Sequence, residues 1–246
     1  MRTWGHDVTA LLELDGVTAG YGGGDVLHDL TLAVEEGGIT CVVGPNGAGK
    51  STILRLVSGL IRPRLGGLRF RGESIAGLNP RQILQRGIVQ VPQERSLFPT
   101  MTVWENVRMG AYTLSNRALT EQRMRSVCEA FPMVADRRNE RVAALSGGQQ
   151  KIVEFARALM LDPKLLILDE PSMGLDPKTH TVVFDMIREM NKSGRTILLV
   201  EQNARSGLGL ASHGVVLESG RVRLEGSGAG VLGNGEIGRL FLGAPA

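Results

Sequence analysis

Nine consecutive residues at positions 44–52 have the types and order of a phosphate-binding loop, G-x-x-x-x-G-K-[ST]. They are Gly44, Pro45, Asn46, Gly47, Ala48, Gly49, Lys50, Ser51 and Thr52. Glycine lets the backbone curl around an anion and point N–H groups at it, where side chains would block the approach. Lys50 is placed to reach the β- and γ-phosphates of a nucleotide, and the Ser51 hydroxyl to ligate Mg²⁺. A glycine-rich turn without a ligand is the alternative.

A pair of adjacent carboxylates, Asp169 and Glu170, ends the hydrophobic run LLIL at 165–168. A buried strand would deliver Asp169 to a metal ion or its waters, and Glu170 could polarise an attacking water. Because Pro171 and Ser172 follow, capping of a helix is the other interpretation. The phosphate loop favours the first, since a nucleotide-bound metal needs an acidic partner.

A second candidate anion site is the segment LSGGQ at 145–149. Its polar and glycine residues are Ser146, Gly147, Gly148 and Gln149. A capping serine and bare backbone N–H groups at the start of a helix can bind an anion. One phosphate needs only one such cradle, so either the segment serves a second molecule or it is an ordinary capping turn.

Strands and loops must position these residues. Apolar, partly β-branched runs predict buried strands at 39–43, 165–169 and 196–201. Shorter strands are expected at 67–71 and 87–90, and a hairpin at 214–226 turning at Ser219 and Gly220. From Leu11 to Val34 we expect two or three short antiparallel strands around the turn Gly22–Gly24.

Helical spacing predicts helices at Ser51–Leu60, Gly147–Leu161 and Pro177–Asn191, the last with proline at its start. In the first of these, Leu54, Leu56, Val57 and Leu60 should form much of one apolar face. Between about 98 and 141 the sequence is rich in Met, Arg, Glu and Ala at helical spacing, which predicts an inserted helical region.

Together, GPNGAGKST, LSGGQ and LLILDEP in this order resemble the ATP-binding cassette (ABC) family. The resemblance implies an α/β P-loop NTPase fold with a mixed central sheet, an N-terminal antiparallel β subdomain and an inserted α-helical subdomain. It implies an ATPase that converts ATP and water to ADP and phosphate. It also implies a head-to-tail pair, in which Ser146 and Gly148 of one chain contact the γ-phosphate held by the other chain's phosphate loop.

The same resemblance assigns three further residues. Gln93, in VPQER, would touch the metal or the water and sense a transmembrane subunit; taken alone, it is a surface glutamine. Tyr21 would stack on adenine, with core packing as the alternative. Asp176, in SMGLDP, would couple the two sites across the interface.

The domain prediction is one ABC ATPase domain over 11–246, with a helical subdomain at about 98–160 and a flexible leader at 1–10. No internal repeat is visible, which excludes two cassettes in one chain.

One position departs from the family pattern, because Gln202 stands where a histidine usually contacts the γ-phosphate. Glutamine can donate a hydrogen bond but carries no imidazolium charge, so hydrolysis at this site could be slower than at a partner's. LLVEQNA at 198–204, the segment 91–107 and the terminal RLFLGA resemble the smaller ATP-binding subunit of branched-chain amino acid importers. Urea and amide importers use similar subunits.

That resemblance implies ATP and Mg²⁺ as cofactors, a second ATP-binding subunit in a homo- or heterodimer, two permeases and an extracellular or periplasmic solute-binding protein. We expect a peripheral location on the cytoplasmic face of the membrane, since no apolar run reaches the ~18 residues of a membrane span. An export or lipid-extraction cassette is one alternative. A cassette acting on nucleic acid is less favoured, because 28 basic and 25 acidic residues give a net charge of only +3.

Overall fold

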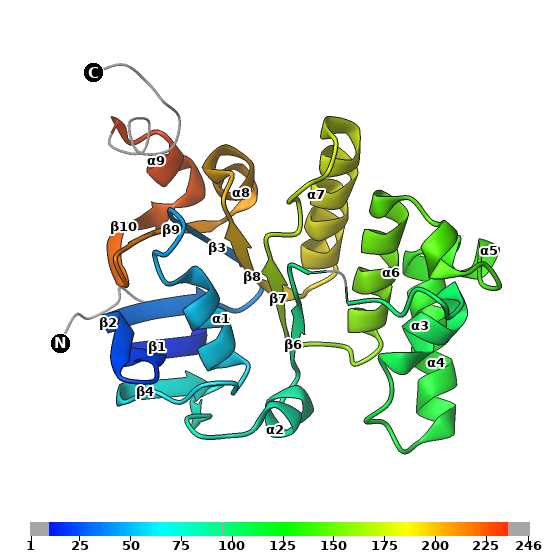
Figure 1. Ribbon diagram of the computed structural model, residues 1–246, viewed down its shortest axis with the longest axis horizontal. Helices are drawn as coiled ribbons and strands as arrows, with labels where there is room; N and C mark the ends of the chain where they lie inside the picture. The colour runs from blue at the N-terminus through cyan, green and yellow to red at the C-terminus, as the bar shows by residue number, and fades with distance from the viewer. Residues whose placement is uncertain (1–9, 95, 236–246) are drawn as a thin grey trace.

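The computed structural model describes residues 10–94 and 96–235 as an α/β fold built on two sheets (Figure 1). Residues 1–9 of the flexible leader expected at 1–10, and the terminal motif RLFLGA, lie outside the described residues, whereas Ala10 already belongs to a strand. The larger sheet has six strands in the order β10-β9-β3-β8-β7-β6. Its members are β3 (Ile39–Val43), β6 (Ile88–Val91), β7 (Leu165–Asp169), β8 (Thr196–Glu201), β9 (His213–Glu218) and β10 (Arg221–Ser227).

The six-stranded sheet is mixed. Five strands run parallel, and β10 pairs antiparallel with β9 as the expected hairpin. Both faces of the sheet are covered, because alternate residues of β7 enter two different hydrophobic clusters. Leu165 and Ile167 face one cluster, and Leu166 and Leu168 face the other. Continuous hydrophobic runs are therefore the pattern that these central strands require.

The smaller sheet is antiparallel, with the order β2-β1-β4-β5. Its strands are β1 (Ala10–Tyr21), β2 (Gly24–Glu35), β4 (Leu65–Phe70) and β5 (Glu73–Ser74). β1 and β2 pair antiparallel about the expected turn near Gly22–Gly24, but they are not the short strands expected at 11–34, because each is 12 residues long. Register shifts between β1 and β2 bend the strands without interrupting their hydrogen-bonded pairing, at points where the sequence stops alternating between apolar and polar residues.

One face of the large sheet packs against the small sheet, helix α1 (Lys50–Val57) and helix α2 (Pro80–Gln85). Helix α1 ends earlier than expected, since Gly59 adopts a left-handed backbone with φ 73°. Leu60 consequently falls outside the helix and is 60% exposed, so its assignment to the apolar face was wrong.

The other face is covered by four helices: α6 (Gly147–Leu159), α7 (Pro177–Lys192), α8 (Ala204–Leu210) and α9 (Gly228–Leu232). Between β6 and β7 the chain also forms α3 (Val103–Met109), α4 (Arg117–Ala130), α5 (Pro132–Asp136) and the short 3₁₀ helix η1 (Val142–Ala144). These helices lie to one side of the sheets (Figure 1). Their apolar residues join the same hydrophobic cluster as the sheet, so this region shares its core with the rest of the fold.

Candidate nucleotide-binding site

The predicted chemical residues gather at the carboxyl edge of the large sheet. Gly44 follows β3, Gln93 comes two residues after β6, Asp169 ends β7 and Gln202 follows β8. The parallel registers Val43↔Glu201 and Asp169↔Val200 bring these strand ends to one level. Open α/β sheets bind ligands at this edge.

The phosphate loop has a backbone that only glycine allows at two positions. Gly49 caps helix α1 with φ 107°, which is strained for any side chain. At Gly44, an added Cβ would lie 2.4 Å from the carbonyl oxygen of Leu217. The Gly220 N–H of the β9–β10 turn also donates to the Ala48 carbonyl at 2.9 Å. The hairpin therefore fixes the shape of the loop from outside.

The Lys50 side chain is only 6% exposed and folds back over this loop. Its Nζ donates to the carbonyl oxygens of Gly44 at 2.7 Å and Pro45 at 3.2 Å. Within the described part of the chain, no hydrogen bond engages the backbone N–H groups of Gly47, Gly49 and Lys50. A row of free N–H groups at a helix N-terminus, beside a lysine, fits a phosphate chain.

Glu170 lies against both Lys50 and Gln93. Its Oε1 is 3.7 Å from Lys50 Nζ, and its Oε2 accepts a hydrogen bond from Gln93 Nε2 at 3.3 Å. The Gln93 amide also donates to the Met173 sulfur at 2.8 Å. Glu170 adopts φ 44°, an uncommon conformation for a non-glycine residue that concentrates at functional sites. The structure thus joins three residues that lie far apart in sequence.

Two carboxyl groups near this point have raised pKa values. Burial, followed by repulsion from Glu170, raises the pKa of Asp169 to about 6, although Lys50 and Arg55 oppose the shift. Burial raises the pKa of Glu201 to about 7, while its hydrogen bond from the Ser172 N–H acts in the opposite direction. Glu201 was not among the predicted site residues, although a carboxylate ending a hydrophobic strand at 196–200 was a signal for it.

The oxygen donors at this edge suit Mg²⁺, which prefers carboxylate, amide and hydroxyl oxygens. Ser51 is exposed at the start of α1, Asp169 is half-buried at the end of β7, and Gln93 keeps its amide oxygen uncommitted among the described residues. No cluster of three or more His, Cys, Asp or Glu residues that could hold a metal occurs in the described ranges. The residues present therefore fit an ion whose remaining oxygen ligands come from a bound phosphate.

Tyr21 is 41% exposed at the end of β1. Its hydroxyl donates to Thr52 Oγ1 at 3.4 Å, and the Arg55 guanidinium lies 5.4 Å from its ring centroid. Both partners belong to α1, so the aromatic ring is held beside the phosphate loop. Arg55 was not predicted to contribute here.

The LSGGQ segment forms a capping box at the start of α6. The Gln149 N–H donates to Ser146 Oγ, and the Ser146 N–H donates to Gln149 Oε1. Ser146 and Gly147 are exposed. In residues 10–94 and 96–235, no hydrogen bond or ion pair links this segment to the phosphate loop. Within one chain, the second anion cradle therefore stands apart from the first.

Asp176 is the N-cap of α7 and fixes Thr179 next to that cradle. One carboxylate oxygen accepts from the Thr179 N–H at 3.1 Å, and the other accepts from its hydroxyl at 2.5 Å. These bonds lower the pKa of Asp176. A Cβ added at Gly148 would lie 2.5 Å from the Thr179 methyl carbon, so the two helix starts are in close contact.

Comparisons with known proteins agree with this geometry. Residues 27–173, more than half of the chain, match the family model described as ABC transporter. The chain is 39% identical to the high-affinity branched-chain amino acid transport ATP-binding protein BraG of Pseudomonas aeruginosa, covering 95% of this chain and 100% of that protein. It is 34% identical to the probable branched-chain amino acid transport ATP-binding protein LivF of Archaeoglobus fulgidus, over 92% and 96%.

Among solved structures, the fold resembles the ADP conformation of an ATP-binding cassette of an ABC transporter, with a TM-score of 0.86 at 26% identity. That match covers 96% of this chain and 100% of the other. A dimeric cassette in a post-hydrolysis state bound to ADP and Pi gives a TM-score of 0.75 at 26% identity, over 88% and 98% of the two chains. The chain therefore belongs to the ABC transporter family and is an ATP-binding cassette ATPase.

Proposed function

We propose that this chain binds ATP with Mg²⁺ and uses its hydrolysis to energise an importer of branched-chain amino acids. The observation that carries the proposal is the 39% identity to a branched-chain amino acid transport ATP-binding protein over that protein's full length. The site supports it, because phosphate loop, Asp169, Glu170 and Gln93 converge at one sheet edge.

Hydrolysis transfers the γ-phosphoryl group to water: a new P–O bond forms as the bond to the bridging oxygen breaks. Glu170 orients the attacking water and accepts its proton. Lys50 leaves the loop carbonyls and places its ammonium group on the phosphates. Ser51, Asp169 and Gln93 would hold Mg²⁺, which supplies neutralisation of phosphate charge when bound. Tyr21 stacks on the adenine, and Gln202 faces the γ-phosphate as a neutral donor.

The working unit is a head-to-tail pair. Ser146 and Gly147 are exposed, and no hydrogen bond or ion pair among the described residues ties the loop 146–149 to the phosphate loop of its own chain. The loop is therefore available to a neighbour's γ-phosphate. Asp176 supports this surface through Thr179. The partner is a second ATP-binding subunit, either identical or similar to this chain.

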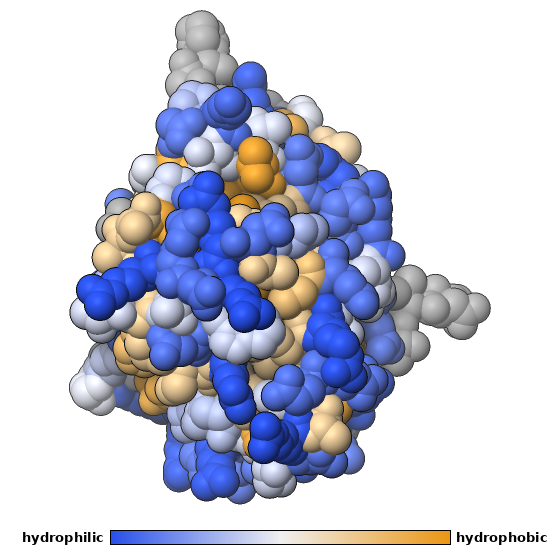
Figure 2. Space-filling view, turned by 90° about the vertical axis from the view of Figure 1, so that its right-hand side faces the viewer, coloured by the Kyte–Doolittle hydropathy of each residue, from blue (hydrophilic) through white to orange (hydrophobic). Residues whose placement is uncertain are grey.

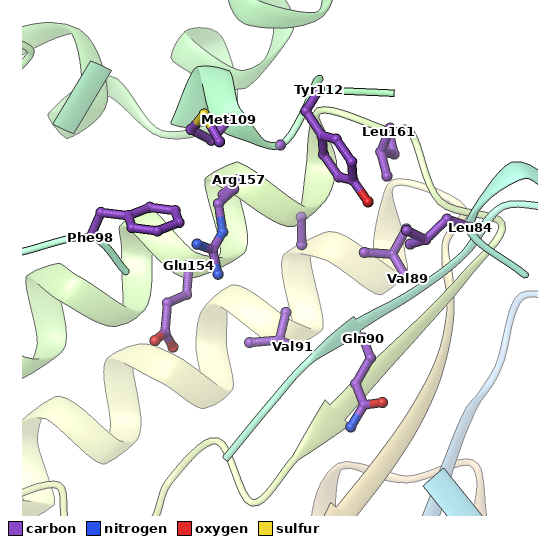
Figure 3. A pocket seen from close by; sticks show the side chains of 12 residues that line it. Leu84, Val89, Gln90, Val91, Phe98, Met109, Tyr112, Glu154, Arg157 and Leu161 are labelled. Atoms are coloured by element: carbon purple, nitrogen blue, oxygen red, sulfur yellow. The ribbon is translucent and has the colours of Figure 1, made fainter. Parts of the chain in front are cut away.

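The helical side of the molecule is where two permeases dock. Three of its apolar side chains are strongly exposed, namely Phe98 at 45%, Met109 at 42% and Tyr112 at 68%. All three line a hollow of about 250 Å³, together with residues that include Leu84 and Arg157 (Figure 3). Figure 2 shows hydrophobic residues gathered between hydrophilic ones on this side of the molecule. Exposed apolar surface of this kind marks a protein interface.

The location follows from the partners. Among the described residues, no helix has the length and apolar character of a membrane span. We therefore place the chain at the cytoplasmic face of the membrane, held by its permeases, with a solute-binding protein delivering the amino acid on the other side. Nucleic acid has no role in this scheme.

Uptake of labelled leucine tests the substrate assignment. Cells lacking this gene should lose high-affinity uptake, and the wild-type gene should restore it, whereas a Glu170→Gln gene should not. Retained leucine uptake with lost urea uptake would contradict the substrate. A lipid-export defect would instead favour the relation to the lipopolysaccharide export protein LptB of Haemophilus influenzae, which is 31% identical over 95% of this chain and 98% of that protein.

A further inference from the structure

Two side chains of helix α6, the helix that starts at the LSGGQ segment, hydrogen-bond to Ser96. Arg157 donates through Nη1 to the Ser96 carbonyl at 2.7 Å and through Nη2 to the Ser96 hydroxyl. The Ser96 N–H donates to Glu154 Oε1 at 3.2 Å. One residue is thus fixed through its amide, its carbonyl and its side chain. Ser96 lies three residues after Gln93 in the sequence.

Helix α3 holds the same segment from its other end. The Phe98 N–H donates to Asn106 Oδ1 at 2.8 Å, and Asn106 Nδ2 returns a bond to the Phe98 carbonyl at 3.0 Å. Asn106 is fully buried. Gly110, just after α3, packs so tightly that a Cβ there would lie 2.1 Å from the Arg157 carbonyl oxygen. Residues 96–98 are therefore bonded to two helices that also contact each other.

This contact combines the buried carboxylate of Glu154 with two half-buried cations, Lys151 and Arg157. Glu154 is 3% exposed and also pairs with Lys151 at 2.6 Å, whereas Arg157 lines the hollow beneath Phe98, Met109 and Tyr112 (Figure 3). Burial lowers the pKa of Arg157, and the Glu154 carboxylate opposes that shift. A planar guanidinium that makes two hydrogen bonds to one residue fixes direction as well as distance, which one lysine ammonium cannot do.

We propose that Arg157, assisted by Glu154, is a positioning residue for hydrolysis: through Ser96 it holds Gln93 against Glu170. Helix α6 then presents Ser146 to the neighbouring chain with its N-terminal end and fixes Gln93 of its own chain with its C-terminal half. The inference rests on the proposed function, because it assigns Gln93 a part in ATP hydrolysis. A purely structural role for Arg157 is the competing explanation.

A double-mutant cycle on the ATPase of the full chain, purified with its membrane subunits, separates the two explanations. We expect Arg157→Met to lower kcat by about tenfold with KM for ATP within about twofold, the pattern of a lost transition-state contact. In a Gln93→Ala background the same change should lower kcat by less than about twofold, because its route to Glu170 is already cut. Arg137→Met, which removes an exposed ion pair with Glu140, is the control and should have no effect.

Ser96→Ala is the gentler variant, since it removes only the hydroxyl bond to Arg157. It should lower kcat about two- to threefold in the wild-type background and should leave kcat unchanged in the Gln93→Ala background. Equal losses of kcat in both backgrounds would overturn the inference in favour of a structural role. An unchanged kcat in Gln93→Ala would also overturn the inference, because Arg157 could then not affect hydrolysis through Gln93. A wild-type complex without ATPase activity would instead refute the proposed function itself.

Discussion

Replacing Glu170 by glutamine perturbs the site at its most connected side chain. The carboxylate lies 3.7 Å from Lys50 Nζ and accepts from Gln93 Nε2 at 3.3 Å. Glutamine has the same shape and keeps an oxygen for the Gln93 bond, but it cannot accept a proton from water. A positioned general base contributes about 10²- to 10⁴-fold, so we expect kcat to fall by that factor, equivalent to roughly 3–5 kcal/mol.

Binding and folding should respond differently from turnover. Lys50 retains its two carbonyl acceptors, at 2.7 and 3.2 Å, so the free energy of unfolding should change by no more than about 1 kcal/mol. ATP affinity should be retained or increase several-fold, because the neutral amide no longer competes with phosphate for the Lys50 ammonium group.

Phosphate release and the binding of a fluorescent ATP analogue measure these two effects on the same preparation. Glu140→Gln, which weakens an exposed pair with Arg137, is the matched control and should leave both unchanged. Turnover in Glu170→Gln within about threefold of wild type would refute the assignment of Glu170 as the base. Loss of ATP binding together with turnover would refute it as well, by making the carboxylate a binding residue.

Three further outcomes are expected. Glu201→Gln should raise the free energy of unfolding on the order of 2 kcal/mol at pH 8 but little at pH 4.5. The reason is that the folded-state pKa of Glu201, about 7, exceeds the usual 4.5, so the wild-type protein loses stability as the pH rises from 4.5 to 7. Equal effects of the substitution at both pH values would contradict this. Gly44→Ala should weaken ATP binding at least about tenfold and destabilise the fold by about 1–3 kcal/mol, because the added Cβ would lie 2.4 Å from the Leu217 carbonyl oxygen. Gly209→Ala is the control: no atom lies near its added Cβ, so it should change neither ATP binding nor stability. Gln202→His should increase ATPase activity if the neutral side chain limits hydrolysis, and an unchanged rate would make the departure from the family pattern inconsequential.

The sequence was most informative where strands are buried on both faces. The hydrophobic runs ending at Val43, Asp169 and Glu201 each became a central strand with the expected bounds. Motif order then indicated which strand ends carry chemistry, and their parallel registers placed Gly44, Asp169 and Gln202 at one edge of the sheet. Local pattern was sufficient here because these strands contain little except core residues.

Prediction was less accurate where tertiary contacts decide. The length of β1 and β2 depends on register shifts that keep one ladder intact, and no local pattern announces them. The end of α1 depends on the backbone at Gly59, which packs against the carbonyl of Leu78. The roles of Met173 beside Gln93 and of Arg157 on Ser96 arise from contacts between segments far apart in sequence.

In the proposed head-to-tail pair, ATP is bound between two cassettes, with Ser146 of one chain at the phosphate loop of the other. Light scattering of the Glu170→Gln chain, alone and mixed with any second cassette that co-purifies with the wild type, measures whether ATP forms this pair. With ATP and Mg²⁺ the mass should rise from the 26.4 kDa of one chain to that of a pair in at least one of the two samples, and Ser146→Arg should abolish the rise. Saturated ATP binding with the mass of a single chain in both samples would show that the nucleotide is not shared between two cassettes.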